Sequence, residues 1–245
     1  MRNLIATILF VFSLTSGTAA AEQQLELAVP FTDNMILQRE SAVPVWGWDV
    51  PGTKVTVQFA GQTQTAVADK NGDWMVKLAP LKVSREERTF AVKNNRGQAI
   101  TLKGVLVGEV WFSSGQSNMV WTAGKSMCNQ LARDLASAKD EVLIREININ
   151  TVSALYPQKR ATSDDGWKKI SAAGGFSALS LAFAHELYKA LDMPIGILLS
   201  AHSNTRIEAF TQRGAIEAHP KLTGDRDLIL DADPLTTQGR KSYEG

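Results

Sequence analysis

Short runs in which apolar and polar residues alternate fill the chain from Leu25 to Leu106. Alternate side chains of a strand point to opposite faces, so this period of two predicts β-strands with one buried face. Two such faces are formed by Val55, Val57 and Phe59 and by Trp74, Val76 and Leu78. Pro-Gly, Ala-Gly and Asn-Gly pairs separate the runs, and residues 95–97 are the expected turn of a hairpin. We therefore predict an all-β sandwich, Ig-like or jelly-roll-like, in this part of the chain.

After Gly108 the pattern changes to apolar runs that alternate with helical periods. Strands are expected in EVWFSSG, VLIREININTV and PIGILLSA. The segment MCNQLARDLASA has helical spacing at Met127, Leu131 and Leu135. The segment FSALSLAFAHELYKAL predicts an amphipathic helix whose buried face is Leu179, Phe183, Leu187 and Leu191. The resulting β-α-β-α-β order is typical of a doubly wound, flavodoxin-like α/β domain of three layers.

The rest of this second region has weaker patterns. Residues 164–175 are polar and contain two adjacent glycines, so a surface loop is expected there. Residues 206–222 predict partial helix, and residues 223–245 are polar and rich in turn formers. Three sheet strands are few for an open α/β domain and would leave an apolar edge exposed. We therefore expect that this domain is truncated.

The N-terminal segment MRNLIATILFVFSLTSGTAAAEQQ predicts a signal peptide. A cation at Arg2 precedes a short apolar core from Leu4 to Leu14, and Ala19 and Ala21 fit the small-x-small cleavage rule. The apolar core is short for a bilayer span, so a retained anchor is the less favoured alternative. We expect residues 1–21 to be removed and the mature protein to be exported, to the periplasm or the cell exterior, without a membrane span.

Composition narrows the possible partners and cofactors. The net charge is +1 and the basic residues are scattered, which gives no support for binding to nucleic acid. Cys128 is the only cysteine, so no intramolecular disulfide can form. No metal-ligand spacing, phosphate-binding loop or dinucleotide fingerprint occurs, so we expect no metal and no cofactor. Trp46, Trp48 and Trp74 suggest either core packing, which we favour, or a platform for sugars.

The stretch FSSGQSNMVW contains the strongest candidate for chemistry. Ser117 follows a predicted strand and precedes a predicted helix, at the end of the sheet where α/β proteins bind ligands. Backbone N–H groups of such a turn can stabilise an oxyanion, so Ser117 is placed for acyl transfer if a base takes its proton. The alternative from the same residues is helix capping, because Ser and Asn are common N-caps.

The stretch VLVGEVWFSSGQSNM closely resembles the first block of the sialate O-acetylesterase family, a branch of the SGNH hydrolases. The segments FTDNMILQRESAVPVWGWDVPGTKVTV, DKNGDWMVKLAPL and FSALSLAFAHELYKALDMPIGILLSAHSNTRIEAF also resemble that family, up to about Pro220. The resemblance implies that Ser117 is the nucleophile, with Gln116 and Asn118 beside it as residues that bind the oxyanion or the substrate. It also implies a β-sandwich over residues 22–105 and the N-terminal part of an SGNH-type α/β domain over residues 106–245.

The chain departs from the family pattern at two places. The family has a tryptophan and two glycines after the strand that corresponds to PIGILLSA, where this chain has His202, Ser203 and Asn204. Any residue except proline can lend a backbone amide, and Asn tolerates positive φ well, so Ser203 or Asn204 can still form an oxyanion hole. The family's Q-G-E segment and its late Asp-x-x-His block do not occur.

Because the late Asp-x-x-His block is missing, the family pattern does not identify a general base in this chain. His185 lies on the flank of a predicted helix, His219 precedes a proline, and His202 follows a sheet strand at the end where the site is expected. His202 is the candidate to touch substrate, although geometry must decide whether it acts as the base. Loss of the base from a triad costs a factor of about a million, so a chain without one is almost inert.

The resemblance implies a serine-dependent carbohydrate O-acetylesterase that releases acetate, with sialic acids or acetylated plant polysaccharides as substrates. The alternative is an inactive fragment or a carbohydrate-binding remnant that lacks the downstream block. Arg206 and Glu208 are expected either to bind sugar hydroxyls or a carboxylate, or to pair with one another at a helix start.

Overall fold

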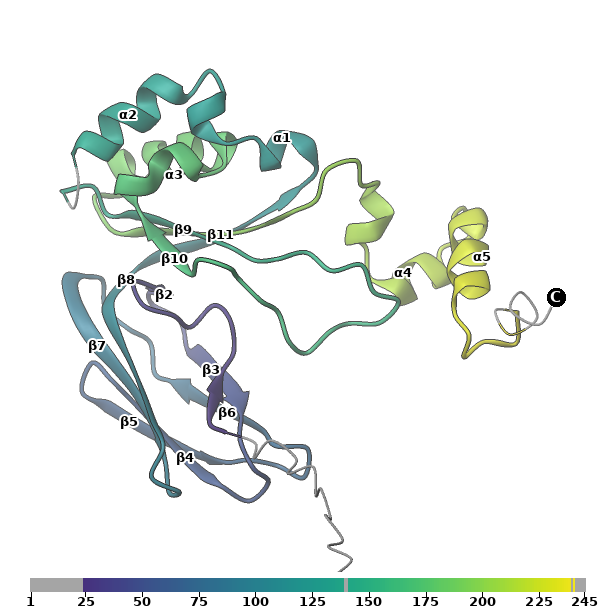
Figure 1. The fold of residues 1–245 in the computed structure, drawn as a ribbon, viewed down its shortest axis with the longest axis horizontal. Helices are drawn as coiled ribbons and strands as arrows, with labels where there is room; N and C mark the ends of the chain where they lie inside the picture. Colours follow the sequence, from purple (N-terminus) through teal and green to yellow (C-terminus); the bar gives the residue numbers. More distant parts are fainter. Residues whose placement is uncertain (1–23, 139–140, 239, 241–245) are drawn as a thin grey trace, which may run out of the picture.

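The structure is a computed structural model that describes residues 24–138, 141–238 and 240. The predicted signal peptide, residues 1–21, lies outside the described residues. Figure 1 shows a lower part built of strands and an upper part in which helices lie over a sheet. The last helices, coloured yellow, extend away from both parts.

Eleven strands are described, in two sheets. They are β1 (Glu26–Leu27), β2 (Ile36–Gln38), β3 (Val43–Trp48), β4 (Lys54–Phe59), β5 (Gln62–Val67), β6 (Asp73–Leu78), β7 (Ser84–Asn94), β8 (Ala99–Gly115), β9 (Ile144–Asn148), β10 (Trp167–Lys169) and β11 (Ile195–Ala201). One sheet has the order β1-β3-β6, and the other has the order β10-β9-β11-β8-β7-β4-β5 with β2 beside β8.

From β1 to the first half of β8 the described chain forms only strands, and the alternation seen in the sequence sets their buried faces. Val55, Val57 and Phe59 of β4 are buried, as are Trp74, Val76 and Leu78 of β6. The expected hairpin turn joins β7 to β8. Trp48 and Trp74 are buried in the same core and Trp46 packs edge-on against Phe31, so these tryptophans serve packing and do not form a sugar platform.

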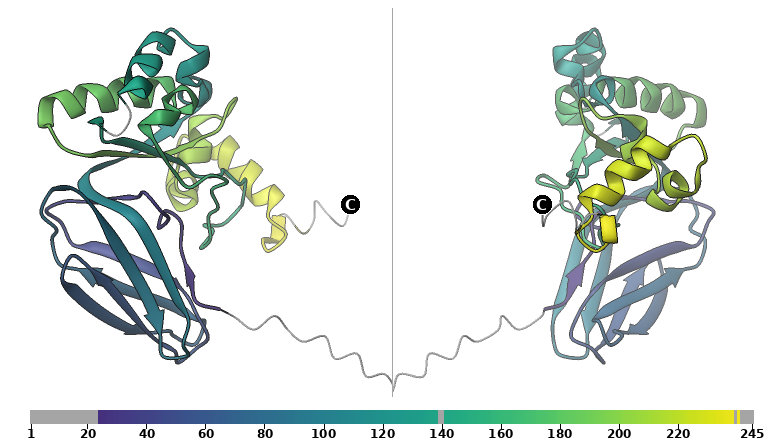
Figure 2. Two further views of the ribbon diagram at one scale, coloured as in Figure 1. Left: turned by 60° about the vertical axis from the view of Figure 1, so that its left-hand side comes forward. Right: turned by 90° about the vertical axis from the view of Figure 1, so that its right-hand side faces the viewer.

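The second region confirms the β-α-β-α-β order in a mixed sheet with helices. Strands β8, β11 and β9 are parallel, and β11 lies between the other two. The helical elements are α1 (Ser117–Val120), η1 (Ala123–Lys125), α2 (Asn129–Ser137), η3 (Ile170–Gly175), α3 (Ala178–Leu191), η4 (Ile207–Phe210), α4 (Arg213–Ala218) and α5 (Thr223–Ala232). Helices α2 and α3 cover one face of this sheet (Figure 2).

Strand β8 belongs to both regions. Its first half pairs with β7 and its second half pairs with β11, so the boundary expected at residues 105 and 106 falls inside one strand. Gly108 lies where the pairing of β8 changes from β7 to β11. A Cβ added to Gly108 would lie 2.0 Å from the carbonyl oxygen of Pro194. A glycine is therefore required where the loop before β11 crosses β8.

Strand β9 has a different environment on each face. Ile144 packs into the core beneath the helices, while Ile147 packs into the core shared with the lower strands. Arg145, on the side of the lower strands, is buried and donates to the carbonyl oxygens of Asn34 (2.7 Å) and Gly104. Its second nitrogen pairs with Glu87 at 2.7 Å. Arg145 therefore joins the two regions through groups of both.

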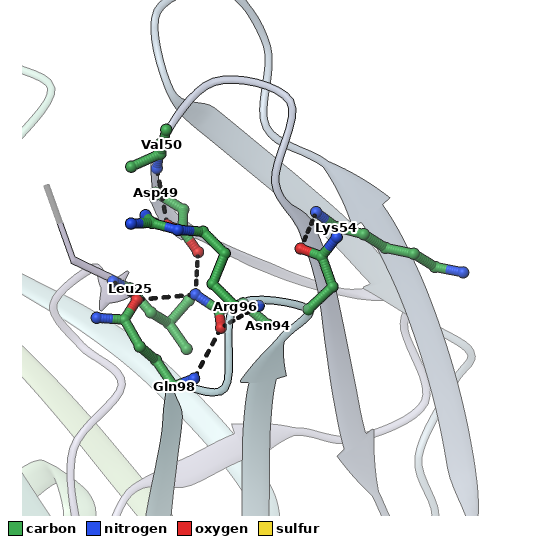
Figure 3. Close-up of polar contacts among 8 residues, drawn as sticks. Leu25, Asp49, Val50, Lys54, Asn94, Arg96 and Gln98 are labelled. Atoms are coloured by element: carbon green, nitrogen blue, oxygen red, sulfur yellow. Dashed lines mark hydrogen bonds and ion pairs between the residues drawn. The ribbon is translucent and has the colours of Figure 1, made fainter.

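A buried carboxylate organises the far end of the lower strands (Figure 3). Asp49 is fully buried and accepts from the Asn94 side chain (2.8 Å) and from the backbone N–H of Val50 (2.7 Å). Gln98 accepts from the same Asn94 amide (2.8 Å) and from the N–H of Leu25 (3.1 Å). These bonds connect the β3–β4 turn, the β7–β8 hairpin and the residue before β1, so one network fixes three segments.

Three of the four residues in the predicted buried face of α3 are wrong. Leu187 packs partly buried against the core, but Leu179, Phe183 and Leu191 are exposed, and the buried positions are Ala178, Ser180, Leu181 and Ala184. Small residues let the helix lie close to the sheet, whereas Phe183 lies over the edge and meets the Trp111 ring at 5.2 Å. Hydrophobicity alone favoured the larger residues, and close packing selected the smaller ones.

Three other expectations need correction. Residues 164–175 are not simply a surface loop, because β10 and η3 lie within them and bury Trp167, Ile170 and Ala173. Met127 lies outside α2 and is fully exposed. Residues 223–232 form α5, although their polar composition indicated turns.

Replacing Arg145 by Met should lower the free energy of unfolding by about 2–4 kcal/mol, because carbonyl groups of Asn34 and Gly104 lose a charged donor. Urea denaturation of the purified chain measures this change. Arg133→Met on the exposed surface of α2 is the matched control, with an expected effect within about 0.5 kcal/mol. Equal stability of the two variants would contradict a joining role for Arg145.

Candidate active site at the carboxyl ends of β8 and β11

Ser117 is the first residue of α1, directly beyond the end of β8. Gly115 has φ +146°, and a Cβ there would lie 2.9 Å from Cγ of Met119, so glycine permits the sharp change from strand to helix. The Ser117 hydroxyl is partly exposed and donates to Oε1 of Gln116 at 3.4 Å. Gln116 and Asn118 are both exposed. Although Ser117 starts the helix, the residue at the N-cap is Gln116, so the serine hydroxyl is not used for capping.

The residues after β11 lie beside this turn. Ala201, the last residue of β11, pairs with Gly115, and the backbone N–H of His202 donates to the Gly115 carbonyl oxygen at 3.0 Å. Parallel pairing therefore brings two separate sequence motifs to the same end of the sheet, as expected for an α/β ligand site.

The turn at Ser203 and Asn204 has the geometry that the sequence allowed. Asn204 has φ +58°, in the left-handed region that asparagine tolerates better than most residues. Both residues are exposed, and within the described part of the chain no hydrogen bond is made by their backbone N–H groups. These amides are therefore free to donate to a ligand.

The three histidines of the chain all lie in the described residues, and none contacts the Ser117 hydroxyl. His202 is exposed, and its Nδ1 lies 2.9 Å from the Ser203 carbonyl oxygen and 3.1 Å from Oγ1 of Thr205. If Nδ1 carries the proton for the carbonyl, Nε2 is left as a proton acceptor. His185 lies 3.7 Å from Glu186 on α3, and Nδ1 of His219 accepts from the N–H of Lys221. Only His202 therefore lies near the serine turn.

Arg206 and Glu208 pair with one another and not with the serine turn. Their ion pair measures 2.8 Å, and Arg206 also lies 3.2 Å from Asp225 of α5. The alternative of a surface pair at a helix start therefore describes them better than a contact with sugar.

A cavity of about 90 Å³ lies between the ends of β9 and β11, α1 and the start of α3, on the side of the sheet end that carries the serine turn. Val120 of α1 and Ala201 of β11 line it, together with Glu146 and Asn148 of β9 and Lys168 of β10. Ser177, which caps α3 by accepting from the N–H of Ser180, completes the wall next to Glu146. The cavity therefore shares two elements, α1 and β11, with the serine turn.

Glu146 is an acidic residue in a buried position, where an ionised carboxylate is unfavourable. Its side chain faces the helices and it is only 4% exposed. Its two carboxyl oxygens accept from the N–H of Ser177 at 3.1 and 3.2 Å. Burial raises the pKa of Glu146 to about 8, and the Ser177 N–H and the Lys168 ammonium offset only part of this rise. Glu146 is therefore a protonated acid at neutral pH.

Local sequence patterns did not single out Glu146, Lys168 and Ser177. The available signals were Glu146, a charged residue on the face of β9 that also carries Ile144, and a serine directly before a strong helix. Reading them as one site requires β9 and the start of α3 to be adjacent, which local patterns do not reveal.

Within the described residues, no helix has both the length and the apolar character needed to cross a bilayer. No group of three or more His, Cys, Asp or Glu side chains in that part could hold a metal ion.

Comparisons with known proteins agree on one family, although no family model matches the chain. The sialate O-acetylesterase of Rattus norvegicus is 32% identical over an alignment of 228 residues that covers 84% of this chain and 41% of that protein. The sialate O-acetylesterase of Mus musculus is 31% identical over an alignment of 209 residues that covers 77% of this chain and 38% of that protein. A solved structure of a carbohydrate acetylesterase from Xanthomonas citri superposes with a TM-score of 0.72 and 30% identity, covering 80% of this chain and 44% of that one. The chain thus spans about two fifths of the curated relatives it matches.

Glu146→Gln should change how stability depends on pH. The folded chain holds the proton of Glu146 up to about pH 8, whereas the unfolded chain releases it near pH 4.5. The contribution of the protonated form to stability is therefore complete below pH 4.5 and is lost as the pH rises through 8. This loss is on the order of 4 kcal/mol for the wild type and absent in the Gln variant.

Urea denaturation between pH 5 and pH 9 measures this difference. Glu186→Gln, an exposed glutamate on α3, is the control and should follow the wild type. Parallel pH profiles for wild type and Glu146→Gln would show that Glu146 ionises normally in the fold.

Proposed function

Because the chain belongs to the sialate O-acetylesterase family, we propose that it removes acetyl groups from acetylated carbohydrates, with Ser117 as the nucleophile. The observation that supports this most directly is the position of Ser117, on a sharp turn beyond β8. In that turn Gly115 accepts from His202, the residue just before the unused amides of Ser203 and Asn204. A nucleophile needs an exposed oxygen and donors for the negative charge that forms, and the turn supplies both.

The proposed reaction follows from this geometry. The Ser117 oxygen attacks the acetyl carbonyl carbon, and the carbonyl oxygen becomes an oxyanion that the amides of Ser203 and Asn204 stabilise. Collapse of this intermediate breaks the ester bond, releases the sugar hydroxyl and leaves an acetyl group on Ser117. Water then attacks the acetyl-serine and releases acetate.

A base must take the Ser117 proton in the first step and give it to the leaving sugar oxygen. Within the described residues, His202 is the histidine beside the serine turn, and its Nε2 is oriented as an acceptor when Nδ1 bonds to the Ser203 carbonyl oxygen. Movement of the loop around Asn204 would be needed to bring Nε2 to Ser117. His202 is therefore the base that we test first.

A second candidate function is binding of carbohydrate without turnover. The observation in its favour is the present partner of the Ser117 hydroxyl, which is Gln116 and not an imidazole. A site that keeps the serine but lacks a base retains its shape, whereas its rate of ester hydrolysis is mostly lost.

We further propose that the lower strands form an Ig-like or jelly-roll-like sandwich and that residues from 106 onward belong to an SGNH-type α/β domain. The order β8-α2-β9-α3-β11 and the superposition on a carbohydrate acetylesterase support this arrangement.

We also propose export of the protein by the N-terminal segment. The support for export is the cation, apolar core and small-residue site in residues 1–21.

Acetate release from p-nitrophenyl acetate and from an acetylated sugar tests the proposed function. Ser117→Ala should lower the rate at least about a hundredfold, because the nucleophile is removed. Ser137→Ala, an exposed serine on α2, should leave it unchanged. His202→Ala should match Ser117→Ala if His202 is the base. Equal rates for folded wild type and Ser117→Ala would overturn the esterase proposal and favour binding alone.

A further inference from the structure

We propose that the cavity between β9, β11, α1 and the start of α3 binds a small carboxylate of the size of acetate. The inference rests on the proposed function only for the choice of acetate, which is the product of that reaction. The binding itself is argued from the walls of the cavity.

The cavity has one polar side and one mostly apolar side because of the strand register. Lys168 of β10 lies opposite Glu146 of β9, and Asn148 is two residues further along the same strand face. These three polar residues line the side formed by β9 and β10. Leu199 and Ala201 of β11 and Val120 of α1 line the other side, together with the polar Thr122. A molecule with a carboxylate at one end and a methyl group at the other matches this division.

The cavity has room for a small ligand. Its volume is about 90 Å³. A single water needs roughly 10–15 Å³ on the same measure, so the cavity holds several waters. Acetate, with four heavy atoms, fits in this space.

The charge of the wall selects an anion. The charged groups near Glu146 are its own carboxyl and the Lys168 ammonium, which also pairs with Asp165 at 2.6 Å. The remaining neighbours are the Ser177 N–H from α3, the Asn148 amide on β9, Ile197 of β11 opposite Glu146, and Val120 of α1. With Glu146 protonated, this wall offers an acid O–H, an ammonium and an amide, all of which donate to a carboxylate.

This arrangement makes binding depend on pH in a defined direction. A protonated Glu146 donates a short, charge-assisted hydrogen bond to the bound carboxylate. Once Glu146 ionises, two carboxylates face one another at close range and repel. Because burial raises the pKa of Glu146 to about 8, binding is expected at neutral pH and is lost in the alkaline range.

Ligand-observed NMR titration of the full chain with sodium acetate tests the inference. Saturable binding is expected at pH 6.5, and binding about thirtyfold weaker is expected at pH 9.5, since most Glu146 is then ionised. Glu146→Gln, which cannot ionise, should bind with nearly equal affinity at both pH values. Glu186→Gln should keep the wild-type pH dependence.

Three results would overturn the inference, provided that circular dichroism shows folded protein. They are the absence of saturable acetate binding at pH 6.5, equal pH profiles for wild type and Glu146→Gln, and a loss of the wild-type pH dependence in Glu186→Gln. Ser117→Ala separates this inference from the proposed function, because it should bind acetate like the wild type while failing to release it from esters. Acetate binding without any ester hydrolysis would leave the cavity assignment standing and remove the esterase proposal.

Discussion

The continuity of β8 is the constraint on which the rest of the structure depends. One strand pairs with β7 in the lower region and with β11 in the upper region, so neither region can shift along the strand without breaking the other's hydrogen bonds. The same strand ends at Gly115, one residue before the serine turn begins with Gln116. Arg145 adds a second connection through buried bonds to Asn34 and Gly104. The orientation of Ser117 is therefore set by elements of both regions.

Strand β9 shows how the period of two gives a single strand two roles. Arg145 points to the lower strands and holds the regions together, while the next residue, Glu146, points to the helices and lines the cavity. Both are buried polar residues, but their partners differ. Arg145 has carbonyl oxygens and a carboxylate around it, so its charge is compensated. Glu146 has two bonds from a single N–H and the Lys168 ammonium, which also pairs with Asp165, and these are insufficient for a buried anion.

Local sequence patterns predicted the elements whose burial depends on alternation alone. The buried faces of β4 and β6, the hairpin turn after Asn94 and the serine turn after β8 all follow from residues close in sequence. The positive φ of Asn204 is one that its residue type tolerates. Features that depend on distant neighbours could not be predicted in this way. The buried face of α3 depends on how closely the sheet approaches, and the role of Glu146 depends on contact with Ser177.

The two pairings of β8 also differ in the length of chain that separates the partners. The β7–β8 hairpin closes around a turn of a few residues, whereas Glu109 pairs with Ile195, far along the chain. Closing the longer loop costs more chain entropy, and contacts between distant residues form more slowly. The serine turn and the turn at Asn204 come together only through this slower pairing. A folding chain therefore completes the hairpin before it assembles the site.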